Sequence, residues 1–472
     1  MRKVILAGLV AVSTAAFAKV EPSPLFSDGM VLQQNTNARI FGTADPGEKV
    51  AVTPSWDGKT YTTTTDRTGQ WSLAVPTPAG SFEKYTLTIA DGNSQTISNV
   101  LVGEVWLASG QSNMQMPLKG FGGCNVKGGY DEIASSGQWA DNVRFITIPM
   151  DGSETPRESF DARWEVPSPK TSVEFSATAW YFATRLSQIL NIPIGIVNAS
   201  YGGSKVESWL PREILNTYPD VSLNPKDWEN MEEYHRPLLR YNAMFYPIRN
   251  YTYHGIIWYQ GCSNVGFEKT YPERLATMVK HWRSEIGLGD IPFYQVEIAP
   301  YDYGSGEENS GAKLRRAQWQ ACELIPNSGI ICTNDIAEPF ERFNIHPGNK
   351  AVVGHRLADK VANEIYDQKQ FLAISPTFKG HTIKGNEVWV AIDSPERGIC
   401  RNYDIQGFEV AGADGVFHDA DNAWLHWQTN EIVVSSEAVP EPKFVRYGWG
   451  DFKPGTLYGG NYLPLVPFTT ED

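Results

Sequence analysis

Residues 104–120 read EVWLASGQSNMQMPLKG, and they join two very different kinds of sequence. The apolar run Val105–Ala108 has the length and branching of a buried strand. Small and amide side chains then follow from Ser109 to Asn113. In open α/β sheets, ligand sites form at the carboxyl ends of the strands. The abrupt change therefore indicates a buried strand that ends at a functional site around Ser112.

Apolar strands and helical periodicity alternate through the middle of the chain, from residue 101 to about residue 367. Such alternation predicts a parallel sheet covered by helices on both faces, which is an α/β fold. The expected helices are 178–190, 272–287, 311–325 and 348–366, and the expected strands between them are 192–200, 292–300 and 328–335.

The flanking regions have a different pattern, with short β-prone segments separated by Asp-Gly and Asp-Pro-Gly turns. Regularly spaced short strands of this kind predict β-sandwich-like modules. The predicted organisation is a signal peptide at 1–18, an N-terminal β module at 19–100, the α/β domain at 101–367 and a C-terminal β module at 368–472.

Composition narrows the possible partners and the cellular location. The chain has 472 residues and a net charge of −14, which disfavours nucleic acid and anionic membranes as partners. Arg2 and Lys3, an apolar stretch and Ala-Phe-Ala before Lys19 predict a secretory signal, hence a periplasmic or extracellular protein. No later stretch has the length of a membrane span. The sequence does not predict an oligomeric state.

The chain has five cysteines, and no two of them form a Cys-x-x-Cys pair. An odd number spread over a long chain is not a disulfide framework, although one bridge is compatible with export. The spacing also argues against a structural zinc site.

Four predicted strand ends carry the residues of an acyl-transfer site. Ser112 is the candidate nucleophile, and His346 is the candidate base that would activate it. The backbone amides of Ser112 and Gly203 and the side-chain amide of Gln260 could donate to the oxyanion of a tetrahedral intermediate. Each residue alone has an ordinary structural interpretation, such as a helix cap, a loop glycine or a buried amide. Their order at successive strand ends favours catalysis.

The blocks GEVWLASGQSNMQMPL, YGGSKVESW, IIWYQGCSN and NIHPGNKAVVGHRLA resemble those of the sialate O-acetylesterases, a family of the SGNH-hydrolase superfamily. The resemblance implies an SGNH-like domain that removes acetyl groups from sugar hydroxyls, using serine and histidine and neither a metal nor another cofactor. It implies that Ser112 is the nucleophile, that His346 is the base and that Gly203 and Gln260 contribute to the oxyanion hole. Gln111 and Asn113 would brace the turn.

Two departures from the family pattern concern the surroundings of these residues. Cys262 stands where family members often have Glu, and no Asp precedes His346 by two or three residues. Asp335 is our candidate for the third member of a triad, with Glu338 and Glu341 as weaker candidates. A Ser-His dyad oriented by a backbone carbonyl is the alternative.

The predicted substrate is an O-acetylated sugar, first of all O-acetylated sialic acid. A xylan or another acetylated glycan is the alternative, and a catalytically impaired glycan-binding protein is a third possibility. A basic residue at the pocket would favour sialate, because it could pair with the sialate carboxylate. Candidates for this residue are Arg212, Arg240 and Arg342. We expect Trp209, Trp258 and Tyr259 to lie in the core.

Overall fold

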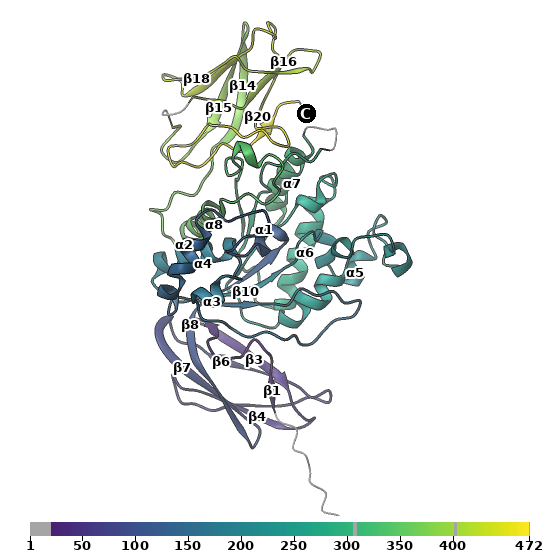
Figure 1. The fold of residues 1–472 in the computed structure, drawn as a ribbon, viewed down its shortest axis with the longest axis vertical. Coiled ribbons are helices and arrows are strands. Elements are labelled where there is room, and N and C mark those ends of the chain that lie inside the picture. Colours follow the sequence, from purple (N-terminus) through teal and green to yellow (C-terminus); the bar gives the residue numbers. More distant parts are fainter. Residues whose placement is uncertain (1–19, 305–308, 401–403, 472) are drawn as a thin grey trace, which may run out of the picture.

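The computed structural model describes residues 20–304, 309–400 and 404–471. Figure 1 shows three parts in a row along the long axis of the molecule. Strands of the N-terminal region lie at one end, an α/β unit lies in the middle, and the C-terminal strands lie at the other end. The predicted signal peptide falls outside the described residues. Within those residues, no helix is both long and apolar enough to cross a bilayer.

The middle unit is built on a parallel sheet of six strands in the order β9-β10-β8-β11-β12-β13. All six strands point the same way, so their carboxyl ends meet at one edge of the sheet. The strands are β8 Ser94–Gly110, β9 Val143–Thr147, β10 Ile194–Ser200, β11 Gly255–Tyr259, β12 Phe293–Val296 and β13 Ser328–Ile331.

Two apolar clusters separate this sheet from the helices that cover it. One cluster includes residues of α4 and α8, and the other includes residues of α6 and α7, so the two helix pairs cover opposite faces. The four predicted helices are confirmed to within two residues at each end, and the three strands between them are confirmed with shorter bounds. The helices are α4 Ala177–Leu190, α6 Tyr271–Ile286, α7 Ser310–Leu324 and α8 Lys350–Ile365.

Strand β8 is 17 residues long and belongs to two regions of the molecule. Its first part pairs with β7 (Ser81–Ala90) and β2 (Val31–Gln33) of the N-terminal region. Its last seven positions, Glu104 to Gly110, pair with β10 in the parallel sheet. The boundary predicted between residues 100 and 101 therefore falls inside one continuous strand.

The N-terminal region adds further strands around β7 and the first part of β8. One group continues the sheet beyond β7, and another forms a separate three-stranded sheet in the order β1-β3-β6. These strands are β4 Lys49–Pro54 and β5 Tyr61–Thr64 in the first group, and β1 Glu21–Pro22, β3 Asn37–Thr43 and β6 Gln70–Pro76 in the second.

The C-terminal region contains two four-stranded sheets that share one apolar cluster, which includes Val390 and Ile432 from one sheet and Val410 and Val445 from the other. The first sheet has the order β14 Thr377–Lys384, β15 Glu387–Asp393, β19 Glu431–Ser435 and β18 Asn422–His426. The second has the order β17 Phe417–Asp419, β16 Phe408–Ala411, β20 Phe444–Tyr447 and β21 Phe468–Thr469.

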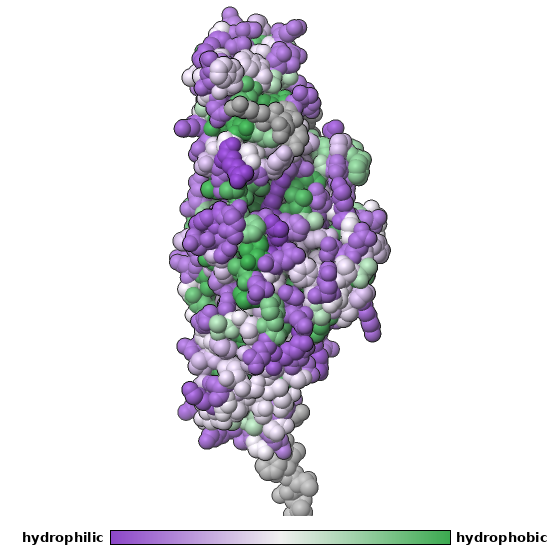
Figure 2. All heavy atoms as spheres, turned by 90° about the vertical axis from the view of Figure 1, so that its left-hand side faces the viewer, coloured by the Kyte–Doolittle hydropathy of each residue, from purple (hydrophilic) through white to green (hydrophobic). Residues whose placement is uncertain are grey.

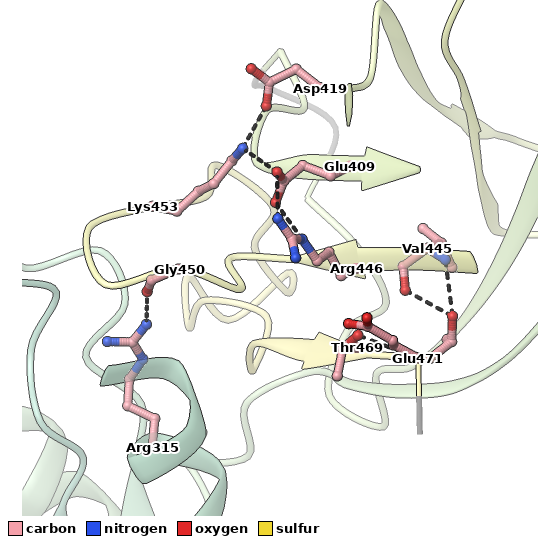
Figure 3. Close-up of polar contacts among 10 residues, drawn as sticks. Arg315, Glu409, Asp419, Val445, Arg446, Gly450, Lys453, Thr469 and Glu471 are labelled. Atoms are coloured by element: carbon pink, nitrogen blue, oxygen red, sulfur yellow. Dashed lines mark hydrogen bonds and ion pairs between the residues drawn. The ribbon is translucent and has the colours of Figure 1, made fainter. Parts of the chain in front are cut away.

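The loop after β20 connects this region to the α/β unit. The Arg315 side chain of α7 donates a hydrogen bond to the Gly450 carbonyl (Figure 3). The Asp451 carboxylate accepts from the Gly311 backbone N–H at 2.6 Å, at the start of the same helix. Within the C-terminal region, Arg446 and Lys453 both pair with Glu409 (Figure 3). These contacts fix the loop against the N-terminal turn of α7.

The surface differs along the length of the molecule. On the face drawn in Figure 2, apolar side chains gather over the α/β unit and at its junction with the C-terminal region. The N-terminal end of the same face is mostly hydrophilic or intermediate. All five cysteines are free thiols in the structure.

Candidate active site

The end of β8 forms a tight turn that carries Ser112. Gly110 has a φ of +134°, and a Cβ atom there would lie 2.2 Å from the carbonyl oxygen of Tyr259 on the neighbouring β11. Only glycine fits this close approach. The Gln111 side chain then accepts a hydrogen bond from the Gly261 N–H at 2.8 Å, which ties the turn to the end of β11. Ser112 follows as the first residue of the short helix α1 (Ser112–Gln115).

Ser112 and His346 are in hydrogen-bond contact, with 2.8 Å between Oγ and Nε2. His346 lies in the loop between the short helix η8 (Pro339–Glu341) and α8. Two hydrogen bonds of 3.0 Å shape this loop: the His346 N–H donates to the Asn344 side chain, and the Asn344 amide donates to the His346 carbonyl. The ring of Phe121 packs against the imidazole at a centroid distance of 5.1 Å.

The environment of His346 favours the neutral imidazole. Burial, followed by the positive charge of Lys350, lowers the pKa of His346 from 6.5 to about 4. A neutral imidazole has one unprotonated ring nitrogen. At neutral pH, His346 can therefore accept the proton of the Ser112 hydroxyl.

Asn113 links the serine turn to the histidine loop. Its Nδ2 donates to the Ile345 carbonyl at 2.9 Å, and its Oδ1 accepts from the Lys350 ammonium at 2.5 Å. The backbone carbonyl of Asn113 also accepts from the Thr178 hydroxyl at 3.0 Å. The sequence analysis missed Lys350, because a lysine in the first turn of an amphipathic helix is ordinarily solvated. Its burial becomes evident only when α8 packs behind the turn.

Two backbone N–H groups next to Ser112 have no acceptor. Among the residues that the structure describes, neither the Ser112 N–H nor the Gly203 N–H donates a hydrogen bond. The loop that carries Gly203 is tied to α1, because the Gly202 N–H donates to the Gln115 side chain at 2.7 Å. Gly203 itself has a φ of +74°, and the ring of Tyr234 covers it.

Gln260 lies close to this loop but has no donor to spare. One hydrogen of its side-chain amide is donated to the Ser204 carbonyl at 3.1 Å, and the other to Asn264 Oδ1 at 2.7 Å. Its Oε1 accepts from the Tyr271 hydroxyl at 3.0 Å. The side chain is fully buried. The structure therefore places Gln260 as a brace of the Ser204 backbone, and the expectation that its amide faces the oxyanion needs correction.

Asp335 is also placed differently from our expectation. Both of its carboxylate oxygens accept from Arg356, and no hydrogen bond joins it to His346. The weaker candidates are engaged as well: the Glu341 carboxylate accepts from the backbone N–H groups of Gly348 and Glu338, and the Glu338 carboxylate lies 3.6 Å from the Lys127 ammonium. Within residues 20–304, 309–400 and 404–471, the second ring nitrogen of His346 makes no hydrogen bond. Among the described residues, the arrangement is a serine–histidine pair without an orienting carboxylate.

Cys262, which departs from the family pattern, is buried beside this site. Burial raises the pKa of its thiol. The side chains of Trp209, Trp258 and Tyr259 are fully buried, so their prediction as core residues is confirmed. Within the described part of the chain, no three His, Cys, Asp or Glu side chains are grouped so that they could hold a metal ion.

The three arginines considered for a substrate carboxylate all have partners within the protein. Arg240 is buried against Glu233, with 2.6 Å between Nη2 and Oε1. Arg342 pairs with Asp302 at 2.9 Å. Arg212 makes a long contact of 3.5 Å to the Glu154 carbonyl.

A parallel sheet flanked by helices, with a serine and a histidine in contact at its strand ends, is an arrangement found in serine esterases. The model of the family described as "Carbohydrate esterase, sialic acid-specific acetylesterase" matches residues 102–363, and the chain belongs to this family. It is therefore a carboxylic ester hydrolase, and the resemblance stated from the sequence motifs is confirmed.

Individual relatives agree with this assignment. The chain is similar to the crystal structure of a carbohydrate acetylesterase from Xanthomonas citri, with a TM-score of 0.83, 32% identity and coverage of 96% of this chain and 99% of that one. It is 26% identical to the sialate O-acetylesterase of Mus musculus over 94% of this chain and 92% of the relative. The sialate O-acetylesterase of Homo sapiens is also 26% identical, over 94% and 91% of the two chains.

Proposed function

We propose that the protein removes O-acetyl groups from carbohydrate through an acyl-enzyme on Ser112. The observation that carries this proposal is the 2.8 Å contact between the Ser112 hydroxyl and Nε2 of a neutral His346. A serine hydroxyl is a weak nucleophile, and a neutral imidazole within hydrogen-bond reach is the group that activates it.

The reaction would proceed in two halves. Ser112 Oγ attacks the acetyl carbonyl while its proton passes to His346 Nε2, and the oxyanion that forms accepts from the free N–H groups of Ser112 and Gly203. The sugar hydroxyl leaves with the proton that His346 returns. Water then gives one proton to His346 as it attacks the acetyl group on Ser112, and His346 returns that proton to Ser112 Oγ as acetate leaves. His346 works as a dyad with Ser112, without Asp335.

For the substrate, we propose O-acetylated sialic acid first, because the matched family and several relatives carry that name. Sialate carries a carboxylate that needs a cation. Lys205, two residues after Gly203, is a candidate, because it forms no ion pair with any described residue and its Nζ lies 4.3 Å from the centre of the Phe267 ring. An acetylated neutral glycan such as a xylan is the second candidate. Arg240 and Arg342 are already paired with carboxylates of the protein, so they are not free to bind a sialate carboxylate, which favours a neutral substrate.

We also propose that the protein is exported with residues 1–18 as its signal peptide. The esterase domain would lie between two sandwich-like modules, with β8 shared between the N-terminal module and the esterase domain. The N-terminal charge, apolar stretch and small-residue site support export. Mass spectrometry of the secreted protein tests this, because a mature chain that still begins at Met1 would contradict it.

Acetate release from an aryl acetate tests the chemistry, with Ser112→Ala compared with the wild type. Ser109→Ala is the matched control, because Ser109 donates to the Ala199 carbonyl at 2.5 Å instead of contacting His346. We expect activity to vanish in Ser112→Ala and to persist in Ser109→Ala. His346→Ala should be folded by circular dichroism and nearly inactive, whereas the exposed His418 can be replaced by Ala as a control. Full activity in Ser112→Ala would reject the proposal.

The two candidate substrates are separated by a parallel assay on 9-O-acetyl sialate and acetylated xylo-oligosaccharides. A preference for sialate that Lys205→Met abolishes would support the first. Equal rates on the neutral glycan in both proteins would support the second.

A further inference from the structure

Lys350 is a buried lysine without an ionic partner. It is fully buried in the first turn of α8, and no carboxylate oxygen among the described residues lies within 4.0 Å of its ammonium. Its charged and titratable neighbours are Cys262, Glu341, Cys124, His346 and Tyr259, and no hydrogen bond or ion pair joins any of these described residues to its ammonium. Burial lowers the pKa of Lys350 from 10.5 to about 7. Burial of an ammonium without an ionic partner costs free energy of folding. We therefore ask which groups the Lys350 ammonium contacts.

The hydrogen bond from Lys350 determines how the Asn113 side chain is oriented. Because Oδ1 accepts from the ammonium, Nδ2 must point the other way, where it donates to the Ile345 carbonyl. Asn113 directly follows Ser112, and Ile345 directly precedes His346. The chain Lys350–Asn113–Ile345 therefore connects the neighbours of both reacting side chains and holds the two loops at one separation.

We propose that Lys350 is a positioning residue for the Ser112–His346 pair, acting through Asn113 on geometry and through its charge on the base. The inference rests on the proposed function, because it assigns a role relative to that pair.

The charge of Lys350 shifts the pKa of His346 in a definite direction. Lys350 is the charged group that lowers the pKa of His346, beyond the effect of burial. The ammonium disfavours the imidazolium, so His346 remains unprotonated to a lower pH than it otherwise would. Removal of the charge should raise the pKa of His346 and move the acid limb of the pH–rate profile upward.

Two variants separate the geometric effect from the charge effect. Lys350→Met removes both the hydrogen bond and the charge, so we expect kcat to fall about 10- to 100-fold and the acid limb of kcat/KM to rise by about one pH unit. Asn113→Ala removes only the link, so kcat should fall while the acid limb stays in place. KM should change little in both. Lys360→Met is the matched control, because Lys360 lies on the same helix and pairs with Glu364.

The geometric role and the charge effect can each be overturned separately. An unreduced kcat in folded Asn113→Ala overturns the geometric role, and an unmoved acid limb in folded Lys350→Met overturns the charge effect. If Lys350→Met does not fold, Lys350→Gln removes the charge and keeps a polar side chain, and the pKa of His346 is compared with that of the wild type by NMR titration: a higher pKa in the variant supports the charge effect, and an equal pKa overturns it. Activity in Ser112→Ala would instead reject the proposed function. Inactive Ser112→Ala with unaffected Lys350 and Asn113 variants rejects this inference alone.

Discussion

Asp335 and Arg356 form a two-point ion pair, with each carboxylate oxygen 2.7 Å from a different guanidinium nitrogen. The side chains retain only 10% and 12% of their exposure, so the pair is largely removed from water. Arg356 also donates to the Cys332 carbonyl at the end of β13. The pair therefore fastens α8, which follows the histidine loop, to the sheet.

Asp335→Asn should affect stability more than catalysis. The loss of one charge from a buried pair leaves Arg356 without its counter-ion, which costs about 3–5 kcal/mol of unfolding free energy when the partner is fully lost and less when an amide replaces it. We expect a lower midpoint in urea unfolding and a kcat/KM within about threefold of the wild type. A large drop in kcat at unchanged stability would return Asp335 to the catalytic site.

The acid limb of the wild-type pH profile should lie far below that of an ordinary histidine. With a His346 pKa of about 4, most of the base is unprotonated at pH 5, so kcat/KM should change by less than about twofold between pH 7 and pH 5. A base with a pKa of 6.5 would lose activity about 25-fold over that interval. Initial rates on a neutral aryl acetate check this, since that substrate does not titrate.

The same shift makes stability depend on pH. Between pH 6.5 and about 4, the unfolded chain binds a proton at His346 that the folded chain does not. This group therefore lowers the free energy of unfolding as the pH falls through that window. In His346→Gln, the corresponding part of the pH dependence should disappear from urea titrations. An unchanged slope would contradict the assigned shift.

Gly203→Ala should reduce turnover strongly. Its φ of +74° strains an alanine by about 1–2 kcal/mol, and the new Cβ would lie 2.4 Å from Cδ2 of Tyr234. The loop must move, and with it the N–H that we assign to the oxyanion. Gly47→Ala is the matched control, with a φ of +80° and open space around the Cβ position. Both variants should lose stability, and only Gly203→Ala should lose kcat. Equal kcat in both would exclude Gly203 from the site.

Gln260→Leu tests whether the Gln260 amide supports the Ser204 backbone or donates to the oxyanion. It leaves the buried Ser204 carbonyl without the amide, which costs about 1–3 kcal/mol of stability, with a loss of kcat of about 10-fold as the loop relaxes. Loss of a true oxyanion donor would cost about 10²- to 10³-fold in kcat. Gln295→Leu removes another buried amide, which donates to the Gln318 carbonyl, and should affect stability alone. Kinetics and unfolding curves of both variants distinguish the two roles.

The sequence was informative where backbone pattern and strand order determine position. Alternating strands and helices predicted the parallel sheet, and residues that follow parallel strands must meet at one edge. Ser112 and His346 were therefore found together although 234 positions separate them. The glycine at position 203 likewise indicated a close approach of the backbone.

The sequence could not show how the side chains would choose among competing partners. Gln260 can donate to an oxyanion or to Ser204, and only the folded loop determines which acceptor is within reach. The Asp335 carboxylate pairs with the guanidinium of Arg356 on α8, because two-point pairing with arginine is stronger than a single hydrogen bond to an imidazole. The continuity of β8 was not evident from the sequence either, since Ser98 and Asn99 directly precede Val100 and Gly103 follows it, and such residues are typical of turns.

That continuity limits how such a protein can be taken apart. A cut at residue 100 would sever a strand whose other end, ten positions later, sets the geometry of Gly110 and the serine turn. The N-terminal region is therefore not a cassette that can be swapped between esterases or trimmed to obtain a minimal enzyme. Strand β8 pairs with β7 at one end and with β10 and β11 at the other, so we expect the N-terminal region and the α/β unit to unfold together. A substitution that disrupts the N-terminal strands should therefore also displace the turn that carries Ser112.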